Sequence, residues 1–172
     1  MAIEYTDSGW FVSDICDYLR DQLGAHWNTE RATLIAQWGD DNYPAQLTVT
    51  NVQSGPLFAP GLDPFIEIYY ENLVEIRHYV STMFDAIWDI RVNVWFHPTL
   101  GVDDVNTLAS RYGVLAYRTL RRHYNDTAGR VVSLKLQDFE AAGRMSGESR
   151  EIDEIAAALT LRVGGRHNNH TP

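Results

Sequence analysis

The residues of this 172-residue chain that could do chemistry include six histidines, one cysteine and a pair of adjacent aspartates. His167 and His170 stand three residues apart, a spacing that can ligate a metal on a helix, but their surroundings of glycine and asparagine offer little preorganisation. The other histidines are scattered, without an HExxH motif or a Cys/His cluster: His26, His78, His97 and His123. We interpret His167 and His170 as part of a polar tail, and we expect neither a bound metal nor a cofactor.

The carboxylates and the cysteine do not form a catalytic pattern either. Asp103 and Asp104 follow a predicted strand and could hold a divalent ion, but a helix N-cap explains the pair without an ion. Cys16 lies on the apolar side of a predicted helix, which favours a buried hydrophobe over a reactive thiol. The sequence has no glycine-rich phosphate loop and no GxSxG motif. We expect that the protein is not an enzyme; the alternative is a small cytosolic enzyme or ligand-binding domain with a pocket near His97 and Tyr112.

Three arginines on one predicted helix form the most informative polar pattern. Arg111, Arg118 and Arg122 are seven and four residues apart, so they form a line at the edge of the apolar stripe of that helix. One interpretation is a solvated helix face. The other is that this line meets an acidic strand edge on another copy of the chain and closes a ring head to tail. The carboxylates predicted for that edge are Glu67, Glu71 and Glu75.

Composition limits the classes of protein that fit. The chain is 45% hydrophobic and 12% aromatic, as in folded globular proteins, and its formal net charge of −9 argues against a protein that grips nucleic acid. An acidic wall would still let DNA slide past. No apolar run approaches the ~20 residues that span a bilayer, and residues 1–7 lack signal-peptide features. We expect one domain over residues 1–163, a flexible C-terminal tail over 164–172, and no membrane partner.

The elements that must position these residues centre on a long strand followed at once by a long helix, between Ala86 and Asn125. Apolar and polar residues alternate from Trp88 to Phe96, which is the period of a half-buried strand. Asp103 is the predicted N-cap of the helix, and an apolar stripe follows it at helical spacing. This helix is expected to pack on a sheet.

The rest of the chain predicts helices before this pair and strands on both sides of it. The expected elements are a helix over 8–23 ended by Gly24, a short helix from Asn28, and strands over 45–52, 64–72, 73–80, 130–139 and 152–163. A turn at Phe84–Asp85 is expected to join the second strand run to the long strand. The fold class predicted is α+β: a two-layer sandwich of a mostly antiparallel β-sheet, with the long helix and the N-terminal helices packed on one face.

Two predicted loops carry side chains suited to docking. The proline-rich segment Ser54–Pro64 is either a stiff surface connection whose apolar residues fold back on the body or a loop that docks on a partner. The segment Ala141–Arg150 is rich in glycine and serine. The candidate docking residues are Leu57, Phe58, Leu62, Arg144 and Met145.

This succession of elements resembles the tail-terminator and tail-completion proteins of tailed bacteriophages. The likeness covers roughly Tyr43 to Arg166. It rests on the strands PFIEIYY and IWDIRVNVWF, the helix VDDVNTLASRYGVLAYRTLRRHY, and the strands GRVVSLKLQDFE and IAAALTLRVGGR. The helix core RYGVLAYRTLRR and the strand GRVVSLKLQDFE carry most of it.

The resemblance implies a non-enzymatic structural protein of the virion neck. Such proteins assemble as six-fold rings that stop growth of the tail tube and present a surface to the head connector, so the implied partners are copies of the chain, the tail tube protein and the connector or adaptor protein. DNA is implied only as cargo passing through the channel, where an acidic lumen would repel phosphate. The ring would be assembled in the host cytoplasm and remain in the virion. A head–tail adaptor is the alternative of the same class.

Overall fold

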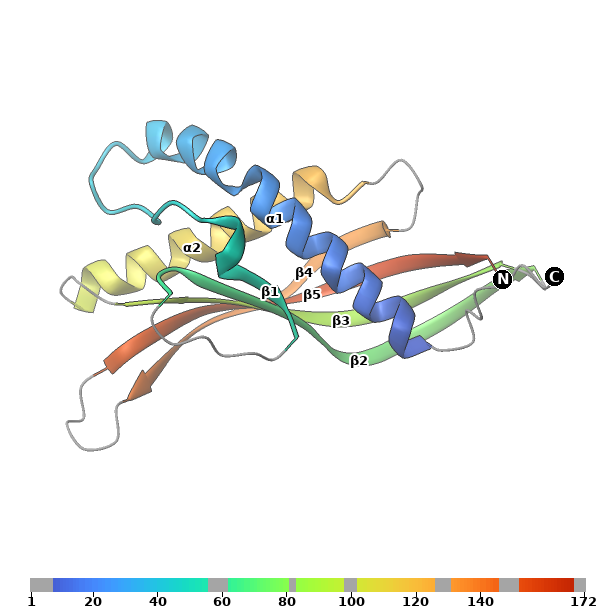
Figure 1. The fold of residues 1–172 in the computed structure, drawn as a ribbon. Coiled ribbons are helices and arrows are strands. Elements are labelled where there is room, and N and C mark those ends of the chain that lie inside the picture. The colour runs from blue at the N-terminus through green and yellow to red at the C-terminus, as the bar shows by residue number, and fades with distance from the viewer. Residues whose placement is uncertain are drawn as a thin grey trace.

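The computed structural model describes residues 8–55, 62–80, 83–97, 102–125, 131–145 and 152–168. The elements in these ranges are α1 (Ser8–Trp38), the 3-10 helix η1 (Val49–Asn51), β1 (Val52–Ser54), β2 (Phe65–Val80), β3 (Met83–Phe96), α2 (Val102–His123), β4 (Val131–Met145) and β5 (Ile152–Asn168). The strands form a five-stranded sheet, and both α-helices lie on the same side of it (Figure 1). The predicted α+β two-layer sandwich is confirmed.

The strand order in the sheet is β1-β2-β3-β5-β4. Only the short β1 runs parallel to its neighbour β2, and the other three pairings are antiparallel. The chain therefore crosses from β3 to the far edge at β4 by way of α2, and β5 returns to fill the place between them. Strands that follow one another in sequence pair in three cases, β1–β2, β2–β3 and β4–β5, but β3 pairs with β5 and not with β4.

Alternation along β3 divides the two faces of the sheet. The even-numbered residues from Ala86 to Phe96 are at most 4% exposed and belong to the hydrophobic core. The odd-numbered residues from Asp85 to Trp95, with those beside them on β2, β5 and β4, lie on the opposite face. We call this the open face, because α1 and α2 lie on the other side of the sheet (Figure 1).

The helix α1 is one continuous element, so the predicted break after Leu23 is wrong. Its apolar residues recur at helical spacing from Ile15 through Trp27 to Leu34, which gives it a buried stripe on both sides of Gly24. Gly24 lies inside the helix, and the helix ends instead before Gly39, whose φ of 71° is the left-handed conformation typical of a C-terminal glycine.

The predicted strand over 45–52 is also wrong, because the backbone groups of Ala45 and Leu47 bond to side chains rather than to a neighbouring strand. The indole of Trp27 donates to the Ala45 carbonyl at 3.1 Å, and the Ala45 amide donates to the Tyr112 hydroxyl at 3.0 Å. Asn28 pairs with both backbone groups of Leu47, at 2.9 and 3.0 Å. These contacts satisfy the backbone without a strand partner, so only residues 52–54 join the sheet.

Two predicted strand runs are a single strand, β2. The pairing of β2 with β3 continues through irregularities at Tyr70/Asn72 and Leu73/Glu75, which absorb the break in alternation seen in the sequence. Phe84 and Asp85 lie within β3, paired with His78 and Arg77, so the predicted turn there is wrong.

The last two strands are longer than predicted, and α2 starts earlier. β4 includes residues 141–145, which were expected to be a loop, and β5 continues past Gly164 to Asn168, into the predicted tail. Each of these extensions is paired with a neighbouring strand, β4 with β5 and the end of β5 with β3. Asp103 lies within the first turn of α2 rather than at its N-cap.

Candidate functional site

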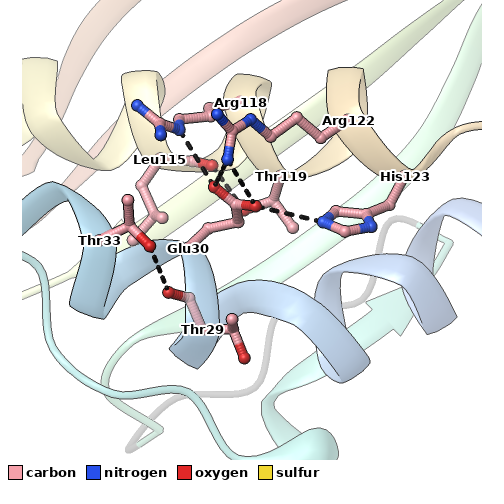
Figure 2. Close-up of polar contacts among 8 residues, drawn as sticks. All are labelled: Thr29, Glu30, Thr33, Leu115, Arg118, Thr119, Arg122 and His123. Atoms are coloured by element: carbon pink, nitrogen blue, oxygen red, sulfur yellow. Dashed lines mark hydrogen bonds and ion pairs between the residues drawn. The ribbon is translucent and has the colours of Figure 1, made fainter.

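The arginine line of α2 faces α1 of the same chain. Figure 2 shows Arg118 and Arg122 reaching from α2 to the carboxylate of Glu30 on α1. Arg118 donates through Nε at 3.0 Å, and Arg122 donates through one terminal nitrogen to both oxygens, at 3.2 and 3.0 Å. The prediction that these side chains line up on one helix edge is supported by this shared partner, and their carboxylate comes from the helix packed beside them.

Glu30 is the centre of this cluster. Its side chain is 6% exposed, and His123 places Nε2 3.2 Å from Oε1, so two arginines and one histidine surround one carboxylate (Figure 2). Burial by itself raises the pKa of Glu30, but the hydrogen bonds from His123, Arg122 and Arg118 outweigh it and leave the pKa below its ordinary value. The cluster therefore holds a charged carboxylate between α1 and α2.

Histidine stacking extends the cluster along α1. The ring of His26 lies parallel to that of His123, with 3.8 Å between ring centroids and 5° between planes. The hydroxyl of Tyr18 donates to the His123 carbonyl at 3.3 Å. The sequence could not predict the contact of His26 with His123, because the two residues are far apart along the chain and meet only where the helices cross.

Arg111, the first arginine of the line, contacts a different carboxylate. It forms an ion pair with Asp40, donates to the Asn42 carbonyl, and lies over the ring of Trp38 with 4.9 Å from its guanidinium carbon to the ring centroid. The hydrogen bonds from Arg111 lower the pKa of Asp40 to about 2. Arg111 therefore anchors the segment that follows α1, rather than presenting a bare charge.

The carboxylates predicted to receive these arginines lie elsewhere. Glu67 is 7% exposed on the open face and accepts hydrogen bonds from Asn93 at 2.6 Å and Trp95 at 3.1 Å. Glu75 forms an ion pair with Arg77 at 2.8 Å, and Glu71 is exposed. Within the chain the structure does not bring the arginine line to any of the three, and a contact between copies through these residues stays a prediction.

The predicted docking residues are placed only in part. Leu57 and Phe58 lie outside the described residues, and Leu62 is half-buried. Arg144 and Met145 belong to β4, where their backbones pair with Glu154 and Ile152. They are thus strand residues at the end of the sheet rather than loop residues.

The open face carries a polar network that sequence reasoning missed. Arg162 forms a two-pronged contact with Asp89 at 3.0 and 3.2 Å, and Arg166 does the same with Asp85 at 2.9 and 3.3 Å. Arg91 on β3 crosses β5 to pair with Glu140 on β4. Oppositely charged residues at alternate positions of the strand sequences were the available signal, but the strand order was needed to show which ones meet.

Neither His97 nor Tyr112 lines the hollow between α1 and β2. Tyr112 is 3% exposed and its ring stacks on Phe96, with 4.5 Å between centroids, so it belongs to the core. Nδ1 of His97 lies 3.5 Å from Oδ2 of Asp63. A cavity of about 490 Å³ lies instead between α1 and β2, lined by Ser13, Cys16, Asp17, Ser54, Gly55, Ile68, Tyr69 and Tyr70. Burial raises the pKa of the Cys16 thiol to about 12, so this thiol is a poor nucleophile.

Among the described residues, no group of three His, Cys, Asp or Glu side chains could hold a metal ion. Neither of the described α-helices is long and apolar enough to cross a membrane. No protein-family model matches the chain, and no curated protein matches it.

Proposed function

We propose that this protein is a ring-forming structural protein of the neck of a tailed-phage virion, which caps the tail tube as a tail terminator and takes part in joining the head to the tail. It would be assembled in the host cytoplasm as a six-fold ring, between the tail tube protein and the head connector. DNA would pass through the ring as cargo.

The observation that carries this proposal is the charge-compensated open face. Four of its arginines contact a carboxylate of the same face: Arg77 with Glu75, Arg91 with Glu140, Arg162 with Asp89 and Arg166 with Asp85. A protein binds DNA largely by neutralising phosphates with cations and releasing counterions. Arginines that already have carboxylate partners contribute little to that exchange, so such a face suits the wall of a passage through which DNA must slide.

The two-layer architecture is compatible with such a wall. If sheets of neighbouring copies surround an axis, one layer faces inward and the other outward. Helices are bulkier than strands and fit best at the larger outer circumference, which leaves the open face toward the axis. The net charge of −9 would add a general repulsion of phosphate.

Electron microscopy of particles made when the gene is disabled in its source phage tests the proposal. Filled heads beside free tails that are over-long or irregular are expected, because tube growth would no longer be capped. Tails of normal length that stay detached from heads would instead favour the head–tail adaptor role. Tails of normal length joined to heads would contradict both roles.

A further inference from the structure

We infer that copies of this chain bind one another head to tail through two exposed apolar patches that lie on opposite edges of the sheet. The inference deepens the proposed function, since its ring geometry rests on that function. It names the surfaces of the contact and assigns the occupant of each patch to a second copy of the same chain.

The first surface, the β2 patch, consists of exposed apolar residues on an edge strand. Its members and their exposed fractions are Tyr70 (48%), Leu73 (40%), Val74 (38%) and Ile76 (44%). β1 pairs only with Ile66–Ile68, so from Tyr69 onward no described strand lies on the outer side of β2. Free strand edges with apolar side chains bind other chains readily, so proteins usually cover them.

The second surface, the α2–β4 patch, lies at the other edge of the sheet. It consists of Val114 (50%), Leu136 (39%) and Phe139 (37%). Phe139 packs so closely on Gly113 that an added Cβ there would lie 2.2 Å from its ring, so the patch has a fixed shape. The outer side of β4 has no described strand partner.

The relative orientation of the two patches favours a second copy as the occupant. Leu73 pairs with Trp88 and Leu136 with Leu161, both of which point to the core, so both patches lie on the helix-covered side of the sheet. The three antiparallel pairings from β2 to β4 make these edge strands run in opposite directions. A copy placed beside the first without being turned over therefore presents its β2 antiparallel to β4, with its helices on the same side.

Charge at the two edges is complementary. Glu71 is exposed on β2. On the other edge Lys135 and Arg121 are exposed together with Asp138 and Glu140, of which Glu140 is already paired with Arg91, so the balance at that edge is positive. A contact of the β2 patch with itself would bring the carboxylate of Glu71 from both copies together, whereas Glu75 is compensated by Arg77. A head-to-tail contact instead brings unlike charges together, and a contact between two different surfaces repeats until a ring closes.

The cavity between α1 and β2 adds depth to the first surface. Tyr70 belongs to the β2 patch and also lines that cavity of about 490 Å³. Side chains of the neighbouring copy thus have a hollow beside the strand edge, and apolar side chains that enter such a hollow contribute most to affinity.

Cysteine cross-linking between copies tests the inference directly, because the native Cys16 is buried and the chain has no other cysteine. Ile76→Cys and Leu136→Cys are made in two full-length chains that carry tags of different mass. Under a mild oxidant, we expect a disulfide-linked pair when the two variants are mixed and little product from either alone. The variant with both changes in one chain should give a ladder of linked copies. Ala32→Cys, on an exposed position of α1, is the matched control and should link to neither.

Three results would overturn the inference. One is self-linkage of Ile76→Cys stronger than mixed linkage, which would mean a two-fold contact. Another is absence of the mixed product in samples whose mass, measured by native mass spectrometry, shows that copies have assembled. A sample that stays monomeric at the concentration found in isolated tails also counts against the contact.

Charge reversal gives a second and independent readout. Glu71→Lys is expected to weaken self-association by about tenfold, and mixing it with Lys135→Glu should restore most of the loss. If the mixture of the two variants does not regain self-association, the charges of Glu71 and Lys135 do not contribute to the contact. The two proposals can fail separately. If the cysteine variants link head to tail but disabling the gene leaves tails of normal length, the contact stands and the terminator function is rejected. If disabling the gene gives over-long tails but the variants do not link, the function stands and the contact is rejected.

Discussion

Glu30 connects α1 and α2 through charge. Its pKa is lowered in the folded chain, so its contribution to stability is present above the ordinary value of 4.5 and is lost as the pH falls below it. We expect Glu30→Gln to reduce the free energy of unfolding at pH 7 by about 1–3 kcal/mol, since a hydrogen-bonded ion cluster with little exposure loses its anion.

Urea unfolding at pH 7 and at pH 3 measures this effect. The difference in stability between wild type and Glu30→Gln should shrink at pH 3, because below pH 4.5 the unfolded chain takes up a proton at this carboxylate and the folded state loses its advantage. Asp41→Asn, a change at an exposed position, is the control and should leave stability within about 0.5 kcal/mol at both pH values. A constant difference at the two pH values would show that the loss is one of packing and not of charge.

Tyr112 gives a prediction at the alkaline end. Burial raises its pKa to about 12, so its neutral form stabilises the fold, and this contribution is lost as the pH rises from 10 toward 12. Tyr112→Phe leaves the Ala45 amide without this acceptor and should cost about 0.5–1.5 kcal/mol at pH 7, the range of an ordinary hydrogen bond. In alkaline unfolding followed by circular dichroism, the Phe variant should lose less stability between pH 10 and 12 than the wild type does.

Two glycines inside helices predict opposite results at the scale of elements. A Cβ at Gly24 would lie 3.7 Å from Val49, an ordinary contact, so Gly24→Ala should stabilise α1 by about 0.5–1 kcal/mol. A Cβ at Gly113 would lie 2.2 Å from the Phe139 ring, so Gly113→Ala should destabilise by about 1–3 kcal/mol.

Thermal unfolding of both variants measures the contrast. Phe139→Ala in the background of Gly113→Ala should remove the clash, so the two changes should cost less together than the sum of their separate effects. If the two effects simply add in that double-mutant cycle, the cost of Gly113→Ala does not come from a clash with Phe139 on β4.

The sequence was sufficient for the elements with a clear period and insufficient where tertiary contacts decided. The alternation of β3 and the apolar stripe of α2 predicted both elements closely. Gly24 was read as a helix end because a local sequence cannot show that packing continues on both sides of it. The segment before β1 was read as a strand because its β-branched residues do not reveal that Trp27, Asn28 and Tyr112 bind its backbone.

For the molecule as a whole, the open face gives a test of the proposed passage wall. Asp85→Asn with Asp89→Asn removes the two carboxylate charges beside Arg166 and Arg162, so these residues no longer compensate the positive charge of the two guanidinium groups. We expect this variant to bind double-stranded DNA at least tenfold more tightly than the wild type at low salt, with a steeper dependence on salt concentration.

Fluorescence anisotropy with labelled DNA across a salt series measures the difference. Asp41→Asn with Asp63→Asn, at two exposed positions, makes the same change in net charge without removing a described carboxylate partner of these arginines, and it should bind no more tightly than the wild type. Equal gains in the two variants would mean that net charge alone governs DNA affinity.

The candidate site was predictable in its residue types and not in its partners. The spacing of Arg111, Arg118 and Arg122 placed them on one edge of a helix, as found. Their contacts with Glu30 and Asp40 depend on how α1 crosses α2, which no local pattern specifies. The open face required the order β3-β5-β4, because Arg91 and Glu140 are on strands that never pair directly.

The place of β5 between β3 and β4 also has a consequence for the order in which the protein is made. β3 and β4 leave the ribosome before β5, yet each needs β5 as its antiparallel partner. Until β5 emerges, the nascent chain holds a β2–β3 hairpin and an isolated β4 with exposed strand edges, which are prone to pair with other chains. Completion of the sheet is therefore a late step of synthesis. A nascent copy cannot offer both finished edges to a neighbour before that step, and this separates folding from assembly in time.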